Sequence, residues 1–372
     1  MLTIYFLVGI LYLLLMGRLR MYWQKKKSHA QSEKSDEMVN ILIPFRNEAE
    51  NLPLIFNSVV ELNYRPLQVF FINDASEDNS VKIISKLVAE GESKDISFII
   101  LETSGVGKKA ALQTGIQEVS SGIILTTDAD CKLPPSWVEL MCEPFHSDKI
   151  QLVAGPVMSN GQSGFLEKFQ QVEWASVLLV TQASFESGNP LMCSAANLAF
   201  RRAAFMEVGG YMGNEHLLSG DDEFLLKKIL RHFGVNSVSY INDQGSLVKT
   251  SAQGSWQLLF SQKIRWASKW KQHQSNFHML SSLLPVLIQL FFLSSFILLT
   301  RGAQGQLVFC IVWGVKFLSE YKSLSTVLKS YGIKQALWVF LATSIFHPVY
   351  VLRVVLGALS GKFEWKGRKS SD

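Results

Sequence analysis

The 372-residue chain is poor in cysteine and in charge. Its cysteines, Cys131, Cys142, Cys193 and Cys310, form no C-x-x-C pair and no regular spacing. This argues against a zinc site or a disulfide framework and fits a reducing compartment. Charged residues make up only 18% of the chain, whereas 48% of the residues are hydrophobic. A purely soluble protein is less apolar than this, so membrane-spanning segments are expected.

Familiar signals of nucleotide and nucleic-acid binding are also missing. No G-x-G-x-x-G follows the first predicted strand and no G-x-x-x-x-G-K-[ST] occurs anywhere, so dinucleotide-binding and P-loop folds lose their main support. The net charge is +5, but the basic residues form no dense patch interleaved with aromatics. Nucleic acid is therefore not expected as a partner. Much of the positive charge lies beside apolar stretches, where it indicates membrane topology.

The beginning of the chain is predicted to be a membrane anchor. Residues 1–16 carry no charge and are followed by basic residues from Arg18 to Lys27. A signal peptide has the opposite order, with its positive charges first. We therefore predict an uncleaved transmembrane anchor over residues 1–23, with its basic end in the cytoplasm.

The end of the chain, residues 278–372, is predicted to contain further transmembrane or interfacial helices and a basic tail. The apolar segments are His278–Thr300, Leu307–Leu318 and Ala336–Leu359. The second is short and includes Lys316, and the third is interrupted by His347-Pro348. Four full crossings from an outside N-terminus would place the basic tail outside, against the positive-inside rule. We therefore expect one of the last two segments to be re-entrant or interfacial, and the tail to be cytoplasmic.

Residues 38–277 are predicted to form a cytoplasmic α/β domain with a mostly parallel sheet. Apolar runs at Val39–Phe45, Leu67–Asp74, Ile96–Glu102 and Gly122–Asp130 alternate with helical stretches, as in a sheet with helices on both faces. Continuous apolar runs are typical of parallel strands that are buried on both sides. Ligands of such sheets bind at the carboxyl ends of the strands. That rule selects Pro44–Glu48, Asn73–Asp78 and Asp128–Asp130.

Asp128 and Asp130 form a D-x-D directly after an apolar strand. Side chains alternate along a strand, so both carboxylates face the same way if the strand continues through Ala129. Paired carboxylates are suited to Mg²⁺ or Mn²⁺, which share oxygen ligands with substrate phosphates. A solvated acidic turn is the alternative. Cys131, which follows them, is expected to pack in the core.

Other polar residues also admit two interpretations. Asp74 lies too early to cap the next helix and is placed to accept hydrogen bonds from a base or ribose. Lys108 either neutralises a phosphate or lies on a solvated helix face. Asp221 and Asp222 precede an amphipathic helix, where acids serve as a cap. Alternatively, adjacent acids raise each other's pKa and suit a general base.

Gln262, Arg265 and Trp266 have the spacing of one helical face. This face combines an amide, a fork of donors for phosphate and an indole for a sugar ring. The other interpretation is an interfacial helix whose Trp and Arg lie at the level of the lipid head groups.

As a set, these segments resemble the membrane-bound family 2 glycosyltransferases, inverting enzymes of the cellulose, hyaluronan and ceramide glucosyl type. The resemblance runs in the family's order over about residues 39–270, through ILIPFRNEAENL, INDASEDNS, GKKAAL, TTDAD, CSAANLAFRR, SGDDEFLL and QKIRW. The anchor, the C-terminal helices and the tail FEWKGR are also similar. The resemblance implies a GT-A fold, the α/β fold of nucleotide-diphospho-sugar transferases, with transmembrane helices at both ends.

The resemblance also implies roles for individual residues. The residues expected at the donor nucleotide are Pro44, Arg46, Glu48, Asp74, Lys108 and Asp128. The expected metal ligands are Asp128 and Asp130, and the expected general base is Asp222, with Asp221 beside it. The residues expected at the diphosphate and the acceptor are Asn197, Gln262, Arg265 and Trp266. Ala195 stands where the family usually has glycine, which leaves the contacts of the Asn197 loop open.

The function that the resemblance implies is transfer of a sugar from a nucleotide-diphospho-sugar, expected to be UDP-linked. The acceptor is expected to be lipid-linked or a glycan, at the cytoplasmic face of the plasma membrane, with inversion to a β-linkage and with Mg²⁺ or Mn²⁺ as cofactor. The main alternative is a non-catalytic sugar-nucleotide-binding partner of a polysaccharide export complex. A membrane-anchored nucleotidyltransferase is a second alternative, which Q-x-x-R-W fits poorly. The few C-terminal spans favour a lipid-linked or short-chain acceptor.

Overall fold

The computed structural model describes residues 2–24, 38–91, 95–161, 163–213, 220, 222–268, 276–360, 364–365 and 368–369. The chain divides into two compact units. Unit 1 comprises Met1–Lys25, Gly161–Ala183 and Ala252–Asp372, and unit 2 comprises Lys26–Asn160 and Ser184–Ser251. The domain boundaries expected from the sequence remain a prediction.

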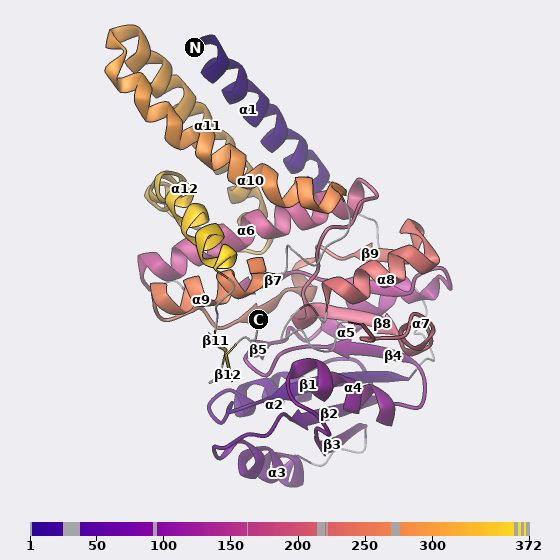
Figure 1. Cartoon of the computed structure of the whole chain (residues 1–372). Coiled ribbons are helices and arrows are strands. Elements are labelled where there is room, and N and C mark those ends of the chain that lie inside the picture. Colours follow the sequence, from indigo (N-terminus) through magenta and orange to yellow (C-terminus); the bar gives the residue numbers. More distant parts are fainter. Residues whose placement is uncertain are drawn as a thin grey trace. The chain divides into compact units, whose positions relative to one another are not determined.

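Unit 2 is built on a seven-stranded sheet with the order β3-β2-β1-β4-β8-β6-β9 (Figure 1). The strands that the apolar runs predict are β1 (Val39–Phe45), β2 (Leu67–Asn73), β3 (Ile96–Glu102) and β4 (Ile123–Thr126). They pair in parallel, β1 with β2 and β4, and β2 with β3. Every residue of β1 and of β4 is buried, which is why these strands read as continuous apolar runs.

The far half of the sheet contains the antiparallel strand. β8 (Leu198–Arg201) runs antiparallel to β4 and to β6 (Leu152–Ala154), and β6 is parallel to β9 (Val238–Tyr240). The sheet is therefore mostly parallel, and the predicted α/β fold class is confirmed.

The helices of unit 2 follow the strands as the alternating pattern predicts. α2 (Leu52–Val60), α3 (Ser80–Glu90) and α4 (Lys108–Glu118) connect the first strands. The shorter helices are α5 (Trp137–Cys142) and α7 (Arg202–Glu207), and α8 (Glu223–Phe233) is longer. α4 and α8 contribute Leu112, Ile116 and Leu226 to the same buried cluster as Leu42 and Ile124 of the sheet. Burial of these apolar side chains is the main contribution to stability.

A second, smaller sheet lies within unit 2. It is three-stranded, with the order β5-β10-β7. The strands are β5 (Cys131–Lys132), β10 (Val248–Thr250) and β7 (Val157–Ser159). β10 is antiparallel to β5 and parallel to β7. These strands have only two or three residues, too few for a recognisable periodic pattern.

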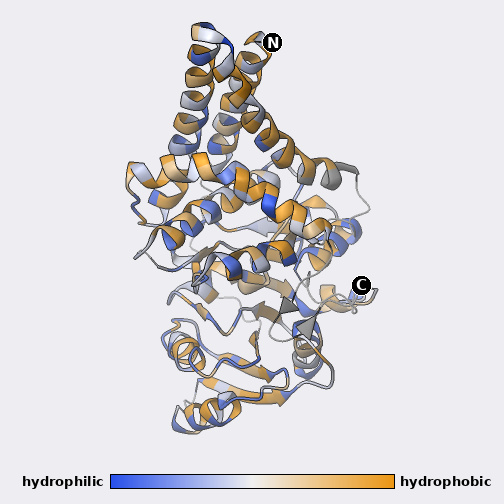
Figure 2. Cartoon of the chain, turned by 60° about the vertical axis from the view of Figure 1, so that its left-hand side comes forward, coloured by the Kyte–Doolittle hydropathy of each residue, from blue (hydrophilic) through white to orange (hydrophobic). Residues whose placement is uncertain are grey.

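Unit 1 is mostly helical. Its helices are α1 (Leu2–Gln24), most of α6 (Phe165–Glu186), α9 (Trp256–Ala267), α10 (Asn276–Ser294), the 3-10 helix η6 (Ser295–Thr300), α11 (Gly302–Ser330) and α12 (Leu337–Leu359), and it also contains a two-stranded sheet of β11 (Glu364–Trp365) and β12 (Arg368–Lys369). Among the described residues, three helical segments are long and apolar enough to cross a membrane, namely Leu2–Gln24, Leu283–Thr300 and Leu337–Leu359. In Figure 2 the helix that starts at the N-terminus is coloured mostly as hydrophobic.

The segment around Lys316, expected as an alternative to the His-Pro segment to be re-entrant or interfacial, lies in a longer helix. It belongs to the 29-residue helix α11, which is not among the candidate spans of the described chain. The ammonium group of Lys316 is paired with Glu320 at 2.7 Å and donates to the carbonyl oxygen of Ser344 in α12 at 2.8 Å. The hydroxyl of Tyr12 in α1 also donates to Glu320, at 2.7 Å. The polar residues of α11 therefore bond to neighbouring helices of the same unit.

Candidate active site

The structure brings the ends of β1, β2 and β4 to one edge of the unit 2 sheet. Phe45 at the end of β1 is in register with Asn73 at the end of β2, and the amide of Asp74 donates to the carbonyl of Phe45 at 2.9 Å. The amide of Thr127, just after β4, donates to the carbonyl of Leu42 at 3.3 Å. The strand ends that the sequence selects are therefore neighbours.

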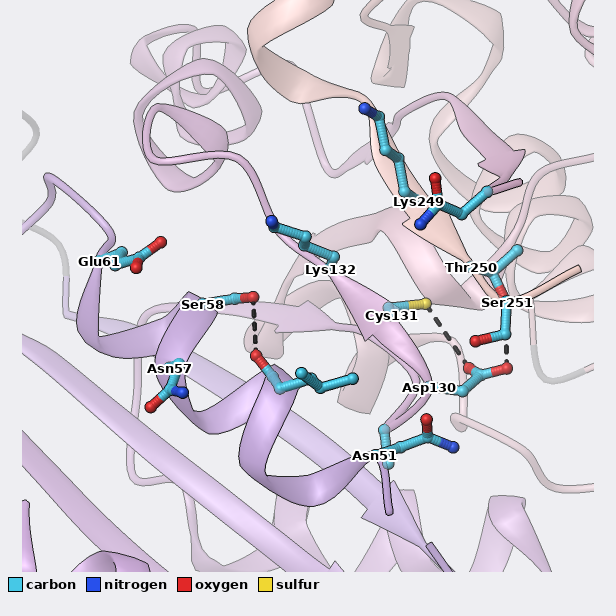
Figure 3. Close-up of a pocket in the computed structure, with 13 residues that line it drawn as sticks. Asn51, Asn57, Ser58, Glu61, Asp130, Cys131, Lys132, Lys249, Thr250 and Ser251 are labelled. Atoms are coloured by element: carbon cyan, nitrogen blue, oxygen red, sulfur yellow. Dashed lines mark hydrogen bonds between the residues drawn. The ribbon is translucent and has the colours of Figure 1, made fainter. Parts of the chain in front are cut away.

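The D-x-D carboxylates have different surroundings. Lys108, at the start of α4, lies 2.5 Å from Oδ1 of Asp128, and the side chains are 22% and 37% exposed. Asp130 accepts a hydrogen bond from Thr250 Oγ1 at 3.1 Å (Figure 3). Burial, followed by the charges of Asp128 and Glu48, raises the pKa of Asp130 to about 6. Cys131 is 2% exposed and packs in the core, as expected.

The donor set at Asp128 and Asp130 fits a hard divalent cation. The pKa of Asp130 is raised partly because neighbouring carboxylates repel its negative charge, and a bound cation would compensate for that repulsion. In the described part of the chain, no group of three or more His, Cys, Asp or Glu side chains is arranged to hold a metal ion. Mg²⁺ sites commonly use one or two protein carboxylates, and substrate phosphates complete the coordination.

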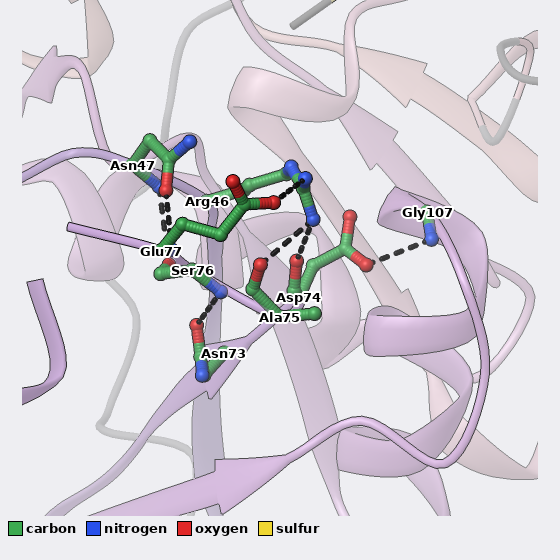
Figure 4. Close-up of polar contacts among 8 residues, drawn as sticks. All are labelled: Arg46, Asn47, Asn73, Asp74, Ala75, Ser76, Glu77 and Gly107. Atoms are coloured by element: carbon green, nitrogen blue, oxygen red, sulfur yellow. Dashed lines mark hydrogen bonds and ion pairs between the residues drawn. The ribbon is translucent and has the colours of Figure 1, made fainter. Parts of the chain in front are cut away.

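Arg46 ties the loops after β1 and β2 together (Figure 4). Its guanidinium donates to the carbonyl oxygens of Asp74 at 3.0 Å and Ala75 at 2.7 Å, and to the carboxylate of Glu77 at 2.9 Å. Asn47 and Ala75 have φ values of 52° and 53°, in the left-handed region that non-glycine residues seldom adopt. Such strain is typical of functional loops.

Asp74 is 2% exposed. Its Oδ1 accepts a hydrogen bond from the amide of Gly107 at 2.9 Å. Gly107, which precedes α4, has a φ of 97°, a conformation that favours glycine. Asp74 therefore orients the loop that carries Lys108, and its contact with a nucleotide base stays a prediction.

Pro44 and Glu48, the other residues expected at the nucleotide, lie in and just after β1. Pro44 is buried in the strand. The carboxylate of Glu48 accepts from the side-chain amide of Asn51 at 2.6 Å, and the backbone amide of Glu48 donates to Ser80 Oγ at 2.8 Å. Both residues thus shape the edge on which Asp74 and Asp128 lie.

Asp222 is the N-cap of α8. Its Oδ1 accepts from the amide of Glu223 at 2.7 Å, and its Oδ2 accepts from the amide of Ala195 at 3.2 Å. The carbonyl of Ala195 in turn accepts from Thr126 Oγ1 at 2.7 Å, at the end of β4. A short chain of hydrogen bonds therefore connects Asp222 to the strand that leads into the D-x-D. Asp221 lies outside the described residues.

Asn197 is 0% exposed and lies in the core of unit 2. Its Oδ1 accepts from the indole of Trp137, and its Nδ2 donates to the carbonyls of Pro156 and Ser246, each at 2.8 Å. A Cβ added to Gly155 would lie 2.4 Å from Nδ2 of Asn197, so the glycine makes room for the amide. These contacts fit a structural role, and contact with the substrate stays a prediction.

Asn197→Ala is expected to destabilise the protein by about 3 kcal/mol or more, because it leaves a buried indole N–H and two carbonyls without their partner. Thermal unfolding of the purified chain measures this. The control is Asn79→Ala, since Asn79 is exposed and its side chain makes no capping bond. Wild-type stability of Asn197→Ala combined with weaker substrate binding would contradict the structural role.

Gln262, Arg265 and Trp266 lie on α9, in unit 1, and each is partly exposed. The structure confirms a helix here and shows contacts that the sequence did not suggest. Lys263 pairs with Glu173 of α6 at 2.7 Å, with side-chain exposures of 6% and 9%. Its ammonium lies 4.9 Å from the ring of Trp174 and 4.3 Å from that of Trp266. How this face meets the acids of unit 2 stays a prediction.

The mostly parallel sheet with acids at its ligand edge is consistent with a GT-A-type α/β domain. The sequence profile of glycosyl transferase family 2 matches residues 40–209. Residues 40–209 of the 372-residue chain are therefore similar to glycosyl transferase family 2 domains.

Two curated relatives and one solved structure are similar to the chain. The poly-beta-1,6-N-acetyl-D-glucosamine synthase of Staphylococcus aureus (strain COL) is 27% identical over 267 residues, which are 71% of this chain and 62% of the relative. The synthase of the same name from Staphylococcus epidermidis is 28% identical over 214 residues, 56% of this chain and 49% of the relative. The matches thus span less than two thirds of these relatives.

The solved structure is the mannosyltransferase PcManGT from Pyrobaculum calidifontis in complex with GDP-Man and Mn²⁺. It has a TM-score of 0.60 and 15% sequence identity, and the match covers 96% of this chain and 97% of that chain. At this identity the similarity establishes the fold.

Proposed function

We propose that the protein transfers a sugar from a nucleotide-diphospho-sugar, expected to be UDP-linked, to a lipid-linked or glycan acceptor at a membrane. The observation that carries the proposal is the arrangement of Lys108, Asp128 and Asp130 at the ligand edge of a domain similar to those of family 2. The names of the relatives support it, since one is a synthase of an amino-sugar polymer and the solved mannosyltransferase contains GDP-Man and Mn²⁺.

Asp128 and Asp130 are the residues that would hold the divalent ion. When bound, Mg²⁺ or Mn²⁺ offsets the charge that develops on the leaving diphosphate. Lys108 adds a positive charge beside Asp128, on the side of the site where Asp74 orients the Gly107 loop. The protein thereby supplies positive charge where the leaving group becomes more negative.

Asp222 is the proposed general base. Its hydrogen bonds from two backbone amides hold the carboxylate in one orientation. The proton passes to Asp222 as the hydroxyl attacks the anomeric carbon from the face opposite the diphosphate. A single displacement inverts the configuration, so an α-linked donor gives a β-linked product.

The proposal is tested by incubating the purified full chain with a panel of labelled nucleotide sugars, with Mn²⁺, Mg²⁺ or EDTA. We expect one donor to be consumed in a metal-dependent reaction, with products that can be sized. Binding of nucleotide sugars without hydrolysis or transfer of any of them would favour the non-catalytic partner of an export complex.

Asp130→Asn is expected to weaken metal-dependent donor binding by at least about 10–100-fold, the loss that follows removal of even a metal's outer-shell partners. The variant is expected to fold, because it removes a partly buried charge that Asp128 and Glu48 repel. A titration with UDP and Mn²⁺ measures the effect. Asp148→Asn, at a fully exposed acid, is the control, and equal UDP affinity in the two variants would contradict the metal role.

We further propose that the protein lies in the plasma membrane with its catalytic domain in the cytoplasm. The three candidate spans, counted from an outside N-terminus, bring the basic tail to the inside, in agreement with the positive-inside rule. A C-terminal tag should therefore be digested by protease only in broken cells. Digestion in intact cells would contradict this orientation.

A further inference from the structure

Unit 2 contains a pocket of about 410 Å³ between α2 and the small sheet (Figure 3). Its polar lining consists of Asn51, Asn57, Ser58, Glu61, Asp130, Lys132, Asn160, Lys249, Thr250 and Ser251. Most of the lining residues thus have polar side chains, alongside Leu54, Ala129 and Cys131. We call it the lysine pocket.

Lys132 and Lys249 are directly opposite each other in the antiparallel pairing of β5 and β10. Directly opposite residues project from the same face of a sheet, with Cβ atoms about 4.5–5.5 Å apart, and like charges in this position are destabilising. Both lysines are exposed, and Figure 3 shows them extending from adjacent strands. Neither forms an ion pair or side-chain hydrogen bond with any residue that the structure describes. The fold therefore keeps two like charges on paired strands, in a pocket whose lining also includes the carboxylates of Glu61 and Asp130.

The lysine pocket adjoins the proposed metal site, but its lining residues are not those expected at the nucleotide. Asp130 lines it and accepts from Thr250, another lining residue. Asp74, Lys108 and Asp128, which are expected at the nucleotide and diphosphate, do not line it. Asp222 does not line it either, so Asp130 is the proposed site residue that a ligand in this pocket would contact.

We propose that the lysine pocket binds a phosphate group of the acceptor. A phosphate between Lys132 and Lys249 converts their mutual repulsion into two charge-assisted contacts, and the side-chain amides of Asn51, Asn57 and Asn160 are suited to its remaining oxygens or to sugar hydroxyls. The assignment to the acceptor rests on the proposed function. The phosphate belongs either to a lipid phosphate or to a soluble sugar phosphate.

Binding of inorganic phosphate tests the pocket directly. The purified full chain is titrated with phosphate in EDTA, followed by ³¹P NMR, as wild type and as Lys132→Gln/Lys249→Gln. We expect binding to weaken about tenfold or more, because charged hydrogen bonds are lost. Lys132→Arg/Lys249→Arg should restore it.

The control is Lys82→Gln/Lys149→Gln, which removes the same charge from two exposed lysines of unit 2. Equal weakening in the control and in the pocket variant would show only a general charge effect and overturn the proposal. Unchanged phosphate affinity in the pocket variant would overturn it as well.

Transfer assays then distinguish the source of the phosphate. The two acceptor probes are a polyprenyl phosphate in phosphatidylcholine vesicles and soluble glucosamine 1-phosphate. Lys132→Gln/Lys249→Gln is expected to raise the KM for the probe that is used about tenfold or more, relative to the KM for the donor. A rise confined to the donor KM would place the lysines at the donor and overturn the proposal.

The proposed function is tested by a separate measurement. A titration with UDP and Mn²⁺ measures binding at the expected nucleotide site of Asp74 and Asp128. Failure of the wild-type protein to bind UDP would therefore count against the proposed function. The metal-free phosphate titration reports only on the lysine pocket.

Discussion

Asp222→Asn is expected to lower sugar transfer by about 10²–10⁴-fold, the usual contribution of a positioned general base, while donor binding persists. Asparagine is as good an N-cap as aspartate, so the hydrogen bond from the amide of Glu223 can be kept. The amide cannot take the proton of the acceptor hydroxyl, and that is the function the substitution removes.

The measurement compares turnover with UDP binding in the presence of Mn²⁺. Asp243→Asn is a matched control, because Asp243 is also a capping aspartate of unit 2, accepting from the amide of Gly245 at 2.7 Å. A loss of turnover as large in Asp243→Asn, or wild-type turnover in Asp222→Asn, would contradict the assignment of the base.

Glu173→Ala is expected to destabilise the protein by about 3–5 kcal/mol, the cost of leaving one charge of a buried ion pair without its partner. The pair with Lys263 is 2.7 Å long, with side-chain exposures of 9% and 6%. The rings of Trp174 and Trp266 surround the ammonium but carry no negative charge to replace the carboxylate. Trp266 belongs to Q-x-x-R-W, so its orientation is expected to change as well.

Thermal unfolding of the full chain in detergent measures the loss. Glu173→Leu/Lys263→Met should recover most of the stability, because well-packed apolar residues replace a buried pair at little cost. The control is Glu90→Ala, which breaks the exposed pair of Lys86 and Glu90 on α3 and should change little. If Glu173→Ala and Glu90→Ala unfold at the same temperature, the buried pair of Glu173 and Lys263 contributes nothing to stability.

The sheet was predictable because its signals are local. The apolar runs of β1, β2 and β4 encode burial on both faces within a few residues, and the polar residues that follow them mark the ligand edge. The pattern thus predicted that Asp74, Asp128 and Asp130 follow strands whose ends lie at one edge of the sheet.

Other parts of the site were not predictable from local patterns. α6, which carries Glu173, was not predicted, and the partner of Glu173 is 90 residues away in the chain. β5 and β10 are too short to give a period, so the pairing of Lys132 with Lys249 had no local signal. Asn197 was expected at the substrate, but its side-chain amide makes three hydrogen bonds within the core, which no local pattern indicated.

The sequence by itself determined the α/β class, the apolar ends and the acids at the strand ends, because periodicity and strand termini are properties of consecutive residues. Only the tertiary structure decided which charges are neutralised and which are not. Lys263 has a buried carboxylate partner and Lys108 has Asp128, while Lys132 faces Lys249 across two short strands. Such differences depend on distances between residues far apart in the chain, and these distances exist only once the chain has folded.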